Sequence, residues 1–165
     1  VTSSMLLQAF DVPLEQVEQR ALSFACATDA LIRGDLEGLF VVSADPTETV
    51  ARAIRAGARL LDVTGPTITR LRADYPFLRT AVIPARTYPG QPRPVETVAV
   101  DVLLLSRVGF PEQFVHRLTW ALFQVLPSLA QQFDYLKLME LSRAPATPVP
   151  LHAGAPWYYR QEELQ

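Results

Sequence analysis

Apolar positions recur at two different spacings along the first part of the chain, and the two spacings alternate. The helical spacing of three or four residues occurs in four segments: 3–10, 27–35, 45–57 and 65–76. Short apolar runs typical of strands occur in four others: 36–44, 58–63, 80–85 and 96–107. Helices that alternate with strands over short connections favour an α/β fold with a mostly parallel sheet.

Local signals predict where several helices begin and end. Gly34 closes the second helix in a position that needs a left-handed residue. Asp45 is the predicted N-cap of the third helix, with Pro46 at its first position and Glu48 three residues after the cap. After Gly109 the pattern turns helical, apart from a proline-rich extended connector at 143–150. It predicts a helix from 110, interrupted at Pro127, and further helices over 128–133, 136–141 and 154–164.

Composition narrows the class of protein. The chain is 49% hydrophobic and 19% charged, so it can bury a core and is not a disordered tail. Its net charge of −2 gives no basic footprint for nucleic acid. The single cysteine, Cys26, excludes an intrachain disulfide, and its small apolar neighbours predict a buried thiol. The first residue is Val1 and a helix follows almost at once, so we expect the chain to be the middle of a longer protein.

Motifs for catalysis are missing from the sequence. It has no G-x-S-x-G nucleophile elbow, no H-E-x-x-H zinc motif and no G-x-x-x-x-G-K phosphate loop. His116 and His152 have no partner at metal-ligand spacing, and His152 is predicted to bond to backbone groups and cap the last helix. We therefore expect a protein that is not an enzyme, with no metal and no cofactor.

Two segments carry candidate ligand-binding side chains. One is the stiff turn Pro84-Ala85-Arg86-Thr87-Tyr88-Pro89-Gly90-Gln91, where Tyr88 either faces a cleft or packs the loop. The other precedes the helix at 45–57, a place where ligands bind in open α/β sheets. The candidate ligand-binding residues are Ser43, Asp45, Thr47, Arg86, Thr87, Tyr88, Gly90 and Gln91. Helix capping is the alternative for the first three, and a solvated surface position is the alternative for Arg86.

Four motifs in order carry a family resemblance over essentially the whole chain. They are Gly34-Asp35 with Phe40 to Pro46, Thr87-Tyr88-Pro89-Gly90, the segment 114–126, and Pro150-Leu151-His152 through Gly154-Ala155 to Tyr158-Tyr159-Arg160. This pattern resembles the TAXI family, the solute receptors of TRAP transporters. Glu37, Asp45 and Ala153 depart from the usual pattern. Asp45 matters most, because it adds a carboxylate near the presumed ligand.

The resemblance implies a periplasmic-binding-protein fold of type II, with two α/β lobes and mostly parallel sheets. On that basis this chain lacks the N-terminal part: residues 1–85 belong to the second lobe, 86–94 cross between lobes, and 95–165 return to the first. The implied ligand is a small organic acid or amino acid, glutamate-like or a dicarboxylate. Hinge closure around it would present the closed receptor to TRAP membrane subunits in the periplasm.

Three other interpretations stay open at this point. The first is an intracellular ligand-sensing domain of a regulator, built on the same fold. The second is an enzyme on this scaffold, which would need a nucleophile or metal in the cleft. The third is a fragment without binding activity of its own, stable only as a homodimer or with its missing half.

Overall fold

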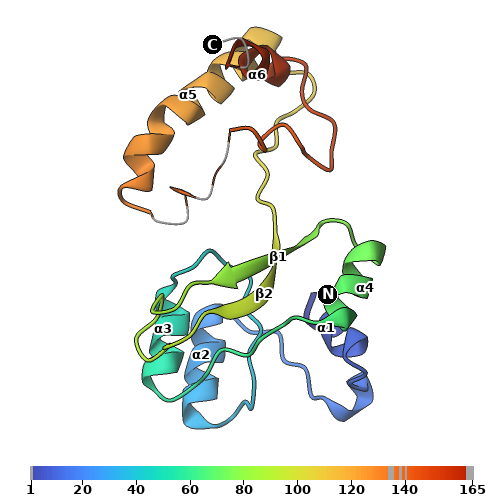
Figure 1. Ribbon diagram of the computed structural model, residues 1–165, viewed down its shortest axis with the longest axis vertical. Coiled ribbons are helices and arrows are strands. Elements are labelled where there is room, and N and C mark those ends of the chain that lie inside the picture. Colours follow the sequence, from blue (N-terminus) through green and yellow to red (C-terminus); the bar gives the residue numbers. More distant parts are fainter. Residues whose placement is uncertain (1, 134–135, 138, 140, 163–165) are drawn as a thin grey trace. The chain divides into compact units, whose positions relative to one another are not determined.

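The structure, a computed structural model, describes all residues except 1, 134–135, 138, 140 and 163–165 (Figure 1). The chain divides into two compact units, Val1–Asp101 and Val102–Gln165. The segment 86–94, expected to cross between lobes, is part of the hairpin loop 84–94 within the first unit. The units join at residues 101 and 102. The assignment of segments to lobes stays a prediction.

Unit 1 combines helices with one small sheet, and its described part has these elements in chain order. They are α1 (Thr2–Ala9), the 3-10 turn η1 (Leu14–Gln16), α2 (Phe24–Arg33), α3 (Glu48–Arg55), α4 (Pro66–Asp74), β1 (Leu78–Ile83) and β2 (Val95–Val100). Helices α2 and α3 pack side by side, and α1 contacts α4 (Figure 1). The chain is therefore mixed α/β, as predicted.

The sheet differs from the predicted one. Strands β1 and β2 pair antiparallel, with Leu78 opposite Val100 and Ile83 opposite Val95. A parallel pair needs a crossover connection, usually a helix, and the loop 84–94 contains none. The prediction of a mostly parallel sheet is therefore not met by the one sheet in the described part of the chain.

Two predicted strands, 36–44 and 58–63, do not form. The second comes close, because the Val63 N–H donates to the Glu96 carbonyl at 2.9 Å. The next hydrogen bond that a ladder would need does not form. The Glu96 N–H donates to the Asp62 carboxylate (Oδ1) at 3.0 Å instead of to a backbone carbonyl. A side chain thus replaces the backbone partner that a ladder would require.

The main apolar cluster of unit 1 joins both ends of its sequence. Leu6 of α1, Ile68 and Leu71 of α4, and Leu78 of β1 are buried together. Helices α2 and α3 meet through small side chains instead, since their buried positions are alanines and one threonine. Small residues let two helix backbones approach closely.

Cys26 lies on the exposed side of α2, so the predicted buried thiol is wrong. The helix begins at Phe24, three residues before the predicted segment 27–35, and Ser23 caps it by accepting from the Cys26 N–H at 3.3 Å. The buried face then falls on Ala27, Thr28 and Ala30. The far end of α2 is as predicted, with Gly34 in the left-handed region at φ 81°.

The predicted cap of α3 is also wrong. The helix begins at Glu48, and Thr47 rather than Asp45 occupies the N-cap position, with extended backbone angles. A contact from outside the helix fixes this start, because the Thr47 N–H donates to the hydroxyl of Tyr88. A local capping signal was overridden by a partner forty-one residues away in the chain.

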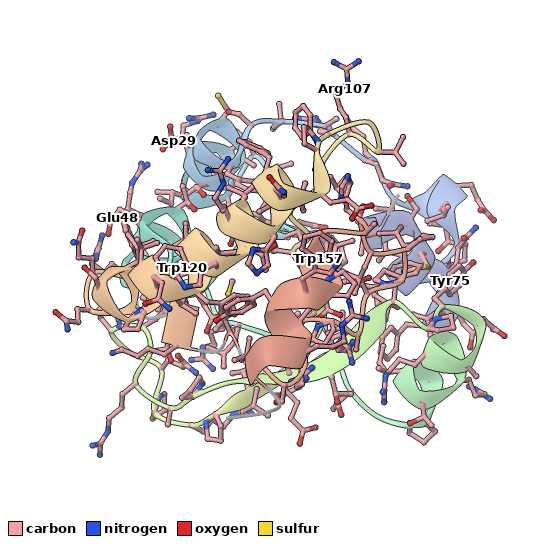
Figure 2. All side chains as sticks on the ribbon, turned by 90° about the horizontal axis from the view of Figure 1, so that it is seen from above. Asp29, Glu48, Tyr75, Arg107, Trp120 and Trp157 are labelled. Carbon is pink, nitrogen blue, oxygen red and sulfur yellow. The ribbon has the colours of Figure 1, made fainter. Side chains whose placement is uncertain are left out.

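Unit 2 is built from α5 (Glu112–Ala130) and α6 (Ala155–Glu162), which pack together. The rings of Phe123 on α5 and Tyr158 on α6 stack with their centroids 5.2 Å apart. Trp120 and Trp157, both labelled in Figure 2, are 50% and 37% exposed. They lie at the edge of this packing rather than in its centre.

The predicted break at Pro127 does not occur, since α5 continues to Ala130. Proline has helical φ and removes one backbone hydrogen bond, and here that loss falls in the last turn. The predicted helix at 136–141 includes positions 138 and 140, which lie outside the described residues.

His152 and Gly154 fix the start of α6, as the sequence predicts for the histidine. The imidazole Nδ1 accepts from the Gly154 N–H, and Nε2 donates to the Val108 carbonyl, both at 3.2 Å. Gly154 itself lies against the first turn of α5. A β-carbon at this position would overlap the backbone carbonyl of Glu112.

We predict that Gly154→Ala destabilises unit 2 by about 1–3 kcal/mol, because the added methyl group must push two backbone segments apart. Gly109→Ala is the matched control in the same unit, since a β-carbon there meets open space. Urea unfolding followed by tryptophan fluorescence measures both, as Trp120 and Trp157 belong to unit 2. Equal unfolding free energies for the two variants would contradict the close approach.

Candidate functional site

The loop 84–94 is organised around one side-chain amide. Gln91 is only 7% exposed. Its Oε1 accepts from the Tyr88 N–H at 3.2 Å. Its Nε2 lies 3.0 Å from the carbonyls of Pro84 and Arg93, and 3.4 Å from that of Ile83. One side chain therefore ties the end of β1, the tip of the loop and the approach to β2 to one another.

Backbone bonds complete the same loop. The Arg86 N–H donates to the Gln91 carbonyl at 2.9 Å, and the Gln91 N–H donates to the Tyr88 carbonyl at 3.1 Å. The Thr87 hydroxyl donates to the Pro84 carbonyl at 2.8 Å. Gly90 has φ 84°, and a β-carbon there would lie 3.8 Å from Ile54 of α3. The loop is thus a fixed structure seated against α3.

Of the two predicted roles of Tyr88, facing a cleft or packing the loop, the structure shows packing. Its side chain is only 3% exposed, and its hydroxyl accepts the Thr47 N–H at 3.2 Å. Burial raises the pKa of the Tyr88 hydroxyl, the Thr47 hydrogen bond opposes that rise, and the nearby Asp45 charge adds to it. The ring is not free to stack on a ligand in this structure, and its role is to join the loop to the start of α3.

Three of the candidate residues hold the loop through hydrogen bonds, namely Thr87, Tyr88 and Gln91.

The other candidate side chains do not hold the loop. Arg86 is exposed and Asp45 is half-buried, and neither side chain forms an ion pair or hydrogen bond within the described part of the chain. The Thr47 N–H donates to the Tyr88 hydroxyl, and the Thr47 hydroxyl is hydrogen-bonded to the Thr49 hydroxyl at 2.7 Å. Ser43 is exposed and makes no hydrogen bond in the described structure.

An open depression of about 630 Å³ lies over the loop. Five of the eight candidate residues line it, together with two prolines: Arg86, Thr87, Tyr88, Pro89, Gly90, Gln91 and Pro92. Its size suits a small molecule. A second depression, of about 340 Å³, is lined by residues of the segment 8–15, and none of them is a predicted site residue.

The family of the chain follows from comparison with known families. The family model described as the NMT1-like family matches residues 1–162. The chain belongs to the NMT1-like family. This family is related to periplasmic binding proteins, receptors of the TRAP and TAXI type among them, so it suggests a solute-binding role in general. It also suggests a fold like that of periplasmic binding proteins for this NMT1-like chain.

Two further searches of this NMT1-like protein concern metal sites and membrane spans. Among the described residues, no group of three or more His, Cys, Asp or Glu side chains could hold a metal ion. Across the same residues, no helix has both the length and the apolar character to cross a membrane.

Sequence reasoning missed the ion pair that flanks the depression. Arg93 pairs with Asp62 at 2.8 Å, and Asp62 also accepts the Glu96 N–H. The Arg93 guanidinium, and then the Glu96 N–H, hold the pKa of the Asp62 carboxyl below its usual range. No local signal links positions 62 and 93, because the pair depends on the 58–63 segment lying beside β2. Arg93 is thus already paired, whereas Arg86 is not.

The ionisation of Tyr88 yields a testable pH dependence. The hydroxyl of an unfolded chain ionises near pH 10. Because burial raises the folded-state pKa, the unfolded chain loses this proton first, and the free energy of unfolding falls as pH rises above about 10. We predict that Tyr88→Phe shows a smaller fall between pH 8 and 11, and a loss of about 0.5–1.5 kcal/mol at pH 8 from the missing hydrogen bond.

Urea unfolding at the two pH values measures both effects. Tyr159→Phe is the reference variant, because burial, and then the neighbouring Tyr158, also raises the pKa of Tyr159, but in unit 2. Equal alkaline losses in wild type and Tyr88→Phe would show that the Tyr88 hydroxyl is not buried as described.

Proposed function

We propose that this NMT1-like protein is a solute-binding receptor for a small organic acid or amino acid, glutamate-like or a dicarboxylate. The observation that carries the proposal is the Arg86 guanidinium. It is exposed, the loop that bears it lines the depression, and no acidic partner neutralises it within the described part of the chain. A planar guanidinium with paired donors suits a carboxylate, to which it donates two parallel hydrogen bonds.

The backbone at Arg86 supports the same proposal. Its φ of 67° lies in the left-handed region, which side chains other than glycine adopt uncommonly and at a cost. The bond from its N–H to the Gln91 carbonyl holds it there. A strained residue that the surrounding structure fixes is often one that function requires, and here the held residue is a cation beside a depression.

We further propose that binding works through closure and includes no catalytic step. Hinge closure is what the resemblance to two-lobed receptors implies. A ligand favours the closed state only by the difference in its affinity for the two states. The family resemblance supports the wider context of the proposal, in which the receptor works in the periplasm and delivers its ligand to the membrane subunits of a TRAP-type transporter.

Titration calorimetry with a set of acids tests the binding role. The set comprises L-glutamate, L-aspartate, glutarate and succinate. We predict that at least one of them binds and that Arg86→Gln weakens its binding about 10- to 100-fold, the effect of losing about 1.5–3 kcal/mol from a charged hydrogen bond. Glutamine keeps a flexible polar side chain at the same strained backbone position.

Arg59→Gln is the matched control, because Arg59 is also exposed and makes no ion pair or hydrogen bond among the described residues. It should bind as wild type does, which excludes a general effect of net charge. Absence of binding by all four acids, or equal binding by Arg86→Gln and wild type, would refute the proposed site.

A further inference from the structure

A run of apolar residues follows β2 and has no strand beside it. Strand β2 ends at Val100, opposite Leu78, which is the first residue of its partner β1. The sequence predicts that the strand continues to 107, since residues 102–105 are Val-Leu-Leu-Leu. In the structure the segment 101–107 is neither helix nor strand, and Figure 1 shows it as a plain trace leading on from β2.

The segment 101–107 exposes groups that a strand normally buries or pairs. Val102 is 96% exposed, and Leu104 and Leu105 are also exposed. Within the part of the chain that the structure describes, no backbone N–H or carbonyl of residues 102–106 forms a hydrogen bond. Consecutive apolar side chains on a backbone with unpaired donors and acceptors are a template for pairing with another strand.

Charges of opposite sign lie at the two ends of this segment, with Asp101 before the apolar run and Arg107 after it. The Arg107 side chain is exposed, projects outward in Figure 2, and makes no ion pair among the described residues. Asp101 pairs with Arg79 through Oδ2 at 2.7 Å. A carboxylate accepts several donors, so Asp101 can bind a second cation through Oδ1.

We propose that a second copy of this chain pairs with the segment 101–107, antiparallel and about a two-fold axis at Leu104. That register places Asp101 opposite Arg107 of the second copy, and the symmetry makes the same pair twice. Leu104 then lies opposite its own equivalent, and the central leucines cover one another. In-register parallel pairing would put like charges opposite each other, and a shifted antiparallel register would separate the opposite charges.

The length of the segment sets the expected strength of this association. A strand pair of this length buries less surface than the roughly 1,200–2,000 Å² of a standard protein–protein interface. We therefore expect a reversible dimer with a dissociation constant on the order of micromolar. This pairing is independent of the proposed binding of an acid, because none of its residues lines the depression over the loop 84–94.

A charge exchange, followed by sedimentation velocity of the whole chain over about 1–200 μM, tests the register. Arg107→Asp and Asp101→Arg should each weaken the dimer at least about tenfold, because like charges then face each other at both ends. An equimolar mixture of the two variants should dimerise about as strongly as wild type, since opposite charges face each other again. Arg59→Asp, at an exposed arginine elsewhere in unit 1, is the control and should dimerise as wild type does.

Cysteine cross-linking gives a second readout of the same register. The exposed Cys26 is first replaced by serine. Leu104→Cys should then cross-link to itself under mild oxidation, because residues directly opposite each other lie within reach of a disulfide. Val102→Cys is the matched control and should not cross-link, because its equivalent in the second copy lies about 13 Å away along the strand.

Three results would overturn the proposal. One is a chain that stays monomeric over the whole concentration range. Another is a dimer that does not respond to the charge exchange, or that cross-links equally through positions 102 and 104, because such a dimer uses another surface. The third is growth beyond the dimer, which would show open strand-by-strand aggregation instead of a two-fold pair.

Discussion

The side-chain amide of Gln91 satisfies backbone groups at both ends of the loop 84–94 and at its tip, and it does so from a buried position. Without Gln91, several backbone N–H and C=O groups of this proline-rich loop between two antiparallel strands would lack hydrogen-bond partners. Leaving one such group buried and unpaired costs about 1–3 kcal/mol. With Gln91 in place these groups are paired, and Tyr88 lies at the start of α3, where its hydroxyl accepts the Thr47 N–H.

This arrangement separates the groups that build the loop from those that the proposed ligand would contact. Buried and hydrogen-bonded side chains hold the loop, and Arg86 keeps its charge unpaired. A binding group held in place by packing loses little freedom when a ligand arrives, and that saving adds to affinity. The left-handed backbone at Arg86 is part of the same loop, because the bond from its N–H to the Gln91 carbonyl holds it there.

The sequence predicted those features that depend on neighbours in the chain. Helices α1, α4 and α6 lie close to their predicted positions, and Gly34 ends α2 in the left-handed region. The loop residues were identified as a group because prolines, a glycine and a tyrosine stood together. Their division into inward and outward side chains could not be predicted, since it depends on where Gln91 and Tyr88 find partners across the fold. The sheet direction, the start of α3 and the pair Asp62–Arg93 were missed for the same reason.

Amide hydrogen exchange, measured by NMR on wild type and on Gln91→Ala, tests whether Gln91 organises the loop. We predict slow exchange at Tyr88 and Thr47 in wild type. In Gln91→Ala both should exchange about tenfold faster or more, which corresponds to about 1.4 kcal/mol, while Leu71 in α4 is unaffected. Thr47 is the decisive amide, because it does not touch Gln91 and responds only through the loop and Tyr88. Fast exchange at Thr47 in wild type, or an unchanged rate in Gln91→Ala, would contradict the claim that Gln91 organises the site.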